Sequence, residues 1–165
     1  MIGQQDRMGD RLDEAQLRYL QAADSAAQRR YDDAENEFIA ALHLNPSLHT
    51  ARFQLGLLQL TCAHPDKAQA TWVPLHQASS PAELRHFVLG LEALIVDNFK
   101  ECVAQLQVGI SLNTTNAALN RDMEMMITRI HEVLKANAAA NTTVVPAETT
   151  AKEPVRTDFS LYGKS

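Results

Sequence analysis

The amino-acid sequence repeats with a period of 34 residues, the spacing that separates Ala22 from Gly56 and Gly56 from Gly90. Aligning residues 15–48, 49–82 and 83–116 brings small residues together in two columns and bulky or aromatic residues together in two more. The four columns are Ala22, Gly56, Gly90; Ala34, Ala68, Cys102; Phe38, Trp72, Leu106; and Tyr19, Phe53, Phe87. Such a period is typical of stacked helix-turn-helix units, which usually present a surface to a partner. We therefore expect an all-α solenoid.

The small residues have a physical role in such a stack. They let the two helices of a repeat approach closely, and the bulky residue of each repeat fills the space that remains. Replacing Gly56 or Ala68 by leucine is expected to overpack the stack and to destabilise it by about 1–3 kcal/mol.

Hydrophobic spacing predicts two helices in each repeat and one more after the last repeat. Pro46 ends the second helix, and Pro65 suits the first turn of the fourth because it lacks a donor that this turn does not need. Pro74 falls inside the fourth helix and predicts a kink or an early end there.

Polar residues predict the caps of two helices. Asp32 or Asp33 is expected to cap the second helix of the first repeat. Ser80, followed three residues later by Glu83, is expected to cap the first helix of the third repeat as part of a capping box.

These helices predict one domain, residues 11–135, in which the helix 117–135 covers the exposed end of the stack. The polar residues 1–10 are predicted to be disordered, and so is the tail 136–165, whose composition changes to Ala, Thr, Asn and Pro. Phe159, Leu161 and Tyr162 stand near the end of this tail. We interpret 158–163 as a short motif that docks on this chain or is read by another protein; an accidental apolar end is the alternative.

Charge and composition exclude several classes of partner. The net charge is −5, whereas nucleic-acid binding favours clustered Lys and Arg, so no nucleic-acid partner is expected. No apolar run is long enough to span a bilayer, and the polar start of the chain does not resemble a secretory signal. Cys62 and Cys102 do not form a disulfide framework, which favours a reducing, cytoplasmic location.

The columns resemble the tetratricopeptide (TPR) family over roughly residues 15–135. Leu-Gly recurs at 55–56 and 89–90, and Ala followed four residues later by an aromatic residue recurs at Ala34/Phe38 and Ala68/Trp72. The family's early Trp is replaced by Arg18, Arg52 and His86, and the third repeat has Cys102 and Leu106 with no following proline. The resemblance implies three repeats in a right-handed solenoid, with a concave groove lined by the first helix of each repeat.

By this resemblance, the groove would bind a hydrophobic or amphipathic segment of another protein. The residues that we expect to contact it are Tyr19, Thr50, Phe53, Leu57, Leu84, Phe87 and Leu91. The groove positions hold no Lys, Arg or Asn, which disfavours the grip on a C-terminal carboxylate that some members use. Leu60, Leu94 and Ile95 occupy further groove positions, and for these packing against the next helix is the alternative.

The sequence carries no pattern that predicts catalysis, a metal site or a cofactor. It lacks a Gly-rich phosphate loop, a Cys-x2-Cys pair and a nucleophile elbow, and its six histidines are scattered. Met123 and Met126 are interpreted as adaptable core residues.

We therefore predict a non-enzymatic adaptor or scaffold that binds another protein or peptide. One alternative is a chaperone that resembles, in size and groove character, the small TPR chaperones of bacterial secretion systems and holds an exported client. The other is a structural subunit, in which the helix 117–135 pairs two copies through Met123 and Met126 or docks in a larger assembly.

Overall fold

The computed structural model describes the backbone of residues 2–142, with side chains from residue 8 to residue 140. Within this range the chain is all-α and contains no strand, which confirms the all-α part of the prediction. The elements are α1 (Ile2–Ala27), α2 (Tyr31–Leu44), α3 (His49–Thr61), α4 (Pro65–Trp72), a 3-10 helix η1 (Val73–His76), α5 (Ala82–Ile95), α6 (Phe99–Leu112) and α7 (Ala117–Thr142).

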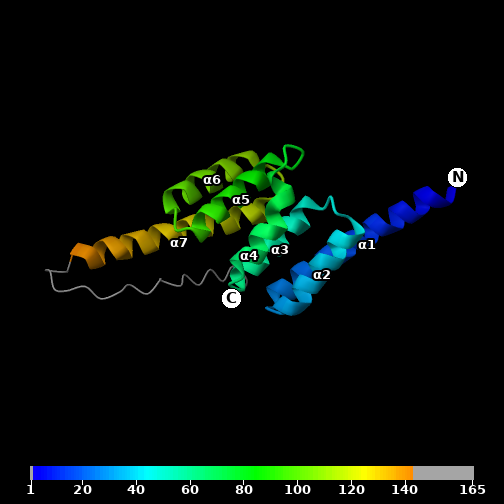
Figure 1. Cartoon of the computed structure of the whole chain (residues 1–165), viewed down its shortest axis with the longest axis horizontal. Helices are drawn as coiled ribbons and strands as arrows, with labels where there is room; N and C mark the ends of the chain where they lie inside the picture. The colour runs from blue at the N-terminus through cyan, green and yellow to red at the C-terminus, as the bar shows by residue number, and fades with distance from the viewer. Residues whose placement is uncertain (1, 143–165) are drawn as a thin grey trace.

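The helices lie side by side in the order of the sequence (Figure 1). The helix α1 packs along α2, α3 along α4, and α5 along α6. Successive pairs are joined where α2 contacts α3 and where α4 and η1 contact α5, and α7 packs on α6. The start of α1 and the end of α7 lie at opposite ends of the elongated molecule (Figure 1).

The 34-residue period is confirmed in the backbone of the three turns that join paired helices. Arg29, Ala63 and Asp97 occupy the same position of successive repeats and have positive φ angles of 60°, 61° and 57°. In each turn the amide of this residue donates to a carbonyl three residues earlier, and the next amide donates to a carbonyl five residues earlier. This pattern is a Schellman motif, which satisfies the last carbonyls of the first helix. Each second helix then begins two residues later, at Tyr31, Pro65 and Phe99.

The same period appears in the register between paired helices. Tyr19 packs on Phe38 with ring centroids 6.1 Å apart, and Phe53 stacks on Trp72 with centroids 6.3 Å apart. Polar pairs with the same separation of 19 residues join the two helices of the first and of the third repeat. These polar pairs are Arg18 with Glu37, at 3.0 Å, and His86 with Gln105, at 2.7 Å. Three helix pairs therefore share one packing register.

The core consists of two clusters of buried side chains that meet at α3. Ala51, Leu55 and Leu58 face the alanine-rich pair α1 and α2. Phe53 and Leu57, on the other side of α3, join the larger cluster formed with α4, η1, α5, α6 and α7. Because successive turns of α3 contribute to both clusters, this helix connects the two ends of the stack.

The prolines act on the helices as predicted, whereas the two predicted side-chain caps do not form. The helix α4 begins at Pro65 and ends at Trp72, and Pro74 lies in the 3-10 turn that follows, so the early end is confirmed. The helix α2 begins at Tyr31 with no side-chain cap, because the preceding Schellman turn sets its start two residues before Asp33. Ser80 does not cap α5, because its hydroxyl donates to the carbonyl of Pro74, 3.1 Å away.

Both terminal helices are longer than predicted. The helix α1 includes residues 2–10, and α7 continues from 135 to 142, so the prediction of disorder is wrong for these two segments. Neither segment contains proline, and the packed part of each helix supplies the costly nucleus from which the helix can propagate. The motif 158–163 and the rest of 143–165 lie outside the described residues.

Candidate interaction surface

Most of the predicted groove residues belong to the core. Phe53, Leu57, Leu84, Phe87 and Leu91 are each at most 3% exposed. The prediction that these five side chains line an open peptide groove is therefore wrong.

The physical reason is that large side chains occupy matching positions in neighbouring repeats and close the space between them. The ring of Phe53 contacts Trp72 of its own repeat and Phe87 of the next, the latter with ring centroids 5.9 Å apart. The helix α7 adds Met123, Met126 and Ile130 to the same cluster. Leu94 is buried there as well, as the packing alternative predicted, while Leu60 and Ile95 pack against its edge.

Tyr19 and Thr50 are the two predicted groove residues that keep partial exposure. Tyr19 packs on Phe38 from the solvent side, and burial of its hydroxyl raises the pKa of Tyr19 above its ordinary value. The neighbouring positions Gln16 and Ala27 on α1 are exposed. The surface that remains accessible on the predicted binding face thus lies mainly along α1.

An apolar strip runs along the exposed side of α1. Met8, Leu12 and Leu20 are 67%, 47% and 55% exposed, and with Gln16 they form a row at four-residue spacing. Residues four apart on a helix lie on the same side, so these side chains form one continuous surface, here called the α1 strip. The α2-facing side of the same helix is formed by alanines that are fully buried.

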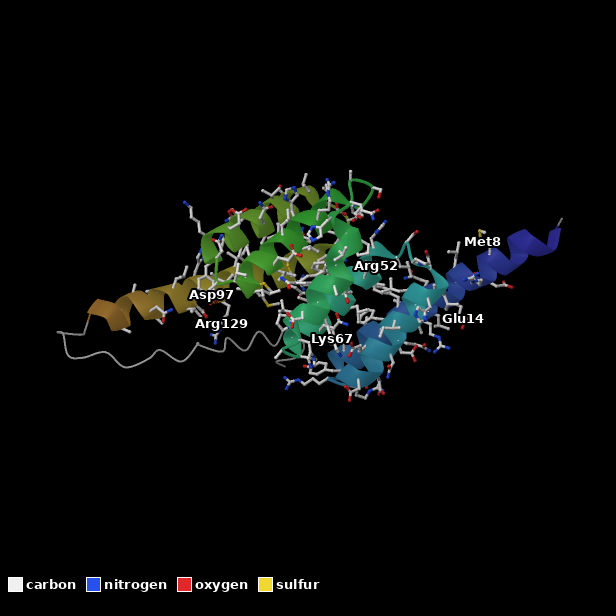
Figure 2. The ribbon with its side chains drawn as sticks, viewed as in Figure 1. Met8, Glu14, Arg52, Lys67, Asp97 and Arg129 are labelled. Carbon is white, nitrogen blue, oxygen red and sulfur yellow. The ribbon has the colours of Figure 1, made fainter. Side chains whose placement is uncertain are left out.

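The first part of the α1 strip projects past the end of α2. The guanidinium of Arg11 reaches the carbonyl of Leu44, the last residue of α2, at 3.5 Å. Residues before Arg11 consequently have no α2 beside them, and Met8 stands on this projecting part (Figure 2). An apolar pattern that continues N-terminal to the first repeat was the signal for this surface in the sequence.

Acidic side chains border the α1 strip. Asp10 and Asp13 are exposed on the described part of α1, next to the apolar row. Of the basic side chains described on this part of α1, Arg18 binds Glu37 at 3.0 Å, and Arg11 contacts the end of α2. Among residues 8–20, the charged side chains left facing solvent beside the strip are therefore mainly acidic.

A second apolar surface lies at the other end of the molecule, between the start of α6 and the second half of α7. A hollow of about 520 Å³ is lined there by Asp97, Asn98, Phe99, Lys100, Val103, His131 and Leu134. Leu134 is 41% exposed. Asp97 is labelled beside α7 in Figure 2. This surface is called the α7 hollow below.

Met123 and Met126 lie in the core, as predicted, and are at most 1% exposed. They are not accessible to a second copy, so the predicted pairing through these two side chains is wrong. Met125, between them in sequence, points outward instead.

Polar groups also gather between α1 and α2, but they are paired with one another. Asp33 binds Arg30 at 2.9 Å, and Asp24 accepts a hydrogen bond of 2.6 Å from Gln28. Among the described side chains, no group of three or more His, Cys, Asp or Glu residues is arranged to hold a metal ion. None of the helices within residues 2–142 has both the length and the apolar content needed to cross a bilayer.

Comparisons of the chain with protein-family models, with curated proteins and with solved structures found no match. The resemblance to the TPR family therefore depends on the residue columns alone. The shared turns and the shared register are observations about this chain itself.

Proposed function

We propose that this chain is a non-enzymatic protein-binding module of TPR type, in which three helix pairs form a right-handed solenoid that α7 covers at one end. Support comes from the three Schellman turns at Arg29, Ala63 and Asp97 and from the common register of the helix pairs. Repeat architectures of this kind are used to present extended surfaces to partners.

The observation that carries the proposed binding activity is the exposure of the α1 strip. Large exposed apolar side chains in one row are typical of interaction surfaces. Burying Met8, Leu12 and Leu20 would contribute about 1.5–3 kcal/mol each before the costs of association are subtracted.

The partner we propose is an amphipathic helix with basic residues beside its apolar face. Its apolar side would pack along the α1 strip, and its basic residues would lie near Asp10 and Asp13. The proposal keeps the class of partner that the sequence predicts, a hydrophobic or amphipathic segment, but places its binding site on α1 instead of at the buried groove positions. The chaperone interpretation stays a prediction with the same class of partner.

The test compares two double variants that remove exposed apolar side chains from different helices, 47% and 55% exposed on α1 and 40% and 45% exposed on α6. Leu12→Glu with Leu20→Glu changes the α1 strip, whereas Val108→Glu with Leu112→Glu changes the outer face of α6. Proteins that co-purify with the wild-type chain are identified by mass spectrometry, and their affinities are then measured with purified components.

We expect the α1 variant to weaken binding at least tenfold, with unchanged helicity by circular dichroism, because two carboxylates would be buried against the apolar face of the partner helix. The α6 variant should bind as the wild type does. Equal binding by both variants, or equal loss in both, would contradict the proposed site.

A further inference from the structure

The α7 hollow has an apolar floor that the described residues leave open. Phe99 and Val103 of α6 and Leu134 of α7 form it, and Val96, just before the hollow, is largely exposed. A hollow of about 520 Å³ is large enough for several side chains of a bound segment. Its rim carries Lys100 and His131 together with Asp97, so both signs of charge are present.

The chain supplies a segment whose chemistry matches this hollow. The last 23 residues, 143–165, contain two aromatic residues, Phe159 and Tyr162, and Leu161 stands between them. Asp158 precedes this group, and its carboxylate would complement Lys100 on the rim. In an extended segment, residues two apart point to the same side, so Phe159 and Leu161 can enter one hollow together.

Chain length favours this hollow over the α1 strip. The helix α7 ends at Thr142, eight residues and about 12 Å beyond Leu134. The 17 residues from Thr142 to Phe159 span at most about 58 Å, so the return of about 12 Å leaves ample slack. The α1 strip lies toward the opposite end of the molecule (Figure 1). Because the local concentration of a tethered group falls with the distance it must span, the nearer site is favoured.

We propose that residues 158–162 fold back within the same molecule and bind the α7 hollow, with Phe159 and Leu161 against Phe99, Val103 and Leu134. A tether of this kind raises the local concentration to about the millimolar range, so even a weak contact is occupied. The bound segment covers the apolar floor of the hollow. This inference does not rest on the proposed function, because it involves neither α1 nor a partner.

The experiment uses the full chain with labelled methyl groups and observes the Val103 and Leu134 resonances by NMR. Phe159→Ser with Leu161→Ser removes the two proposed anchors. Val144→Ser with Val145→Ser is the matched control, because it removes two apolar side chains from another part of the tail. We expect the anchor variant to shift both methyl resonances and to accelerate amide exchange at Phe99–Val103 several-fold, and the control to leave both unchanged.

Two further comparisons examine the hollow and the source of the segment. Leu134→Glu should move the amide signals of residues 159–162 toward those of an isolated 154–165 peptide. Leu112→Glu is the matched control, because Leu112 is 45% exposed and Leu134 is 41% exposed, and it should leave these signals unchanged. Tenfold dilution should leave the wild-type resonances unchanged, because the contact is within one molecule. If Leu134→Glu unfolds the chain, the anchor variant alone decides.

Several outcomes overturn the proposal. Unchanged methyl resonances in the anchor variant would show that the segment does not reach the hollow. Equal effects of the two tail variants, or of the two leucine variants, would show that the effect is not specific. Resonances that change on dilution would show that another copy supplies the segment. The variant Leu12→Glu with Leu20→Glu should not change these resonances, which separates this inference from the proposed function.

Discussion

The indole Nε1 of Trp72 donates a hydrogen bond of 3.1 Å to the backbone carbonyl of Phe53, while the two rings stack with planes 22° apart. The contact is possible because Gly56, one turn after Phe53, has no side chain. A Cβ atom at Gly56 would overlap Nε1, Cε2 and Cδ1 of the indole. The smallest and the largest residue of the repeat are thus in direct contact where α4 packs on α3.

Gly56→Ala is therefore expected to destabilise the protein, although alanine is the better helix former. The indole is rigid and fully buried, so the added methyl group must displace α4 or force Trp72 from its position. We expect a loss of about 1–3 kcal/mol in the free energy of unfolding, measured by urea denaturation.

Two controls separate overpacking from other effects of this substitution. Gly9→Ala makes the same change in α1, where no atom lies within 4 Å of the added Cβ, and should cause no loss. In a Trp72→Leu background, Gly56→Ala should cost less than in the wild type, because the overlapping indole atoms are gone. Additive effects of the two substitutions would contradict the overpacking account.

The turn residue Ala63 predicts a stabilising substitution. Its φ of 61° is unfavourable for any residue with a Cβ atom, and glycine is the preferred residue at this position of a Schellman motif. Ala63→Gly should raise the free energy of unfolding by about 0.5–1 kcal/mol. Ala70→Gly makes the same change at an exposed position inside α4 and should lower it by about 1 kcal/mol. Urea titrations measure the free energy of unfolding of both variants. A decrease for both substitutions would refute the prediction.

Asp122 predicts a pH-dependent change in stability. Partial burial of this α7 side chain raises the pKa of Asp122 above its ordinary value of 3.8, although Arg121 partly opposes the shift. As pH rises from 3.8 toward the higher pKa of Asp122 in the folded chain, the unfolded chain releases this proton first. The free energy of unfolding therefore falls over this range, and the whole loss is present at neutral pH.

Asp122→Asn should therefore be more stable than the wild type at pH 7, and the difference should disappear below about pH 3.5. Thermal unfolding across this pH range measures it. Asp13→Asn removes the same charge from an exposed position and controls for net charge. A gain that stays constant with pH would contradict the assignment to ionisation.

The two cysteines should differ in reactivity. Cys102 is fully buried, and burial raises its pKa to about 12, so its reactive thiolate is scarce and inaccessible. Cys62 is partly exposed, and its pKa is raised by burial and by Glu35 and Asp32. At about pH 8.5, iodoacetamide should modify Cys62 slowly in the folded chain and Cys102 only in urea. Peptide mapping by mass spectrometry would reveal equal labelling if this is wrong.

Features that depend on local sequence were predictable. The period of 34 residues located all three turns, and Pro65 and Pro74 located the start and the early end of α4. The columns Gly56 with Trp72 and Gly90 with Leu106 correctly indicated a close approach of paired helices. These features were accessible because helix breaks and small-to-large complementarity act between residues that the repeat holds at constant separation.

The candidate site was less predictable because accessibility is not a local property. Tyr19, Phe53 and Phe87 occupy one column, yet Tyr19 is partly exposed and the other two are buried. The difference arises because Phe53 and Phe87 lie between neighbouring units and contact each other, whereas Tyr19 belongs to the first unit of the stack. Position within the stack, which the column pattern does not contain, decides whether such a side chain meets solvent.

The sequence by itself determined an all-helical chain with equally spaced turns and helix pairs in one register, because backbone preferences and side-chain volumes recur with the repeat. Only the tertiary structure decided which apolar surfaces are accessible. The end of α2 beside Arg11 leaves the α1 strip uncovered, and α7 closes over Phe87 while leaving Leu134 partly exposed. Exposure depends on how far each helix extends past its neighbours, and that is settled only when all the helices are packed together.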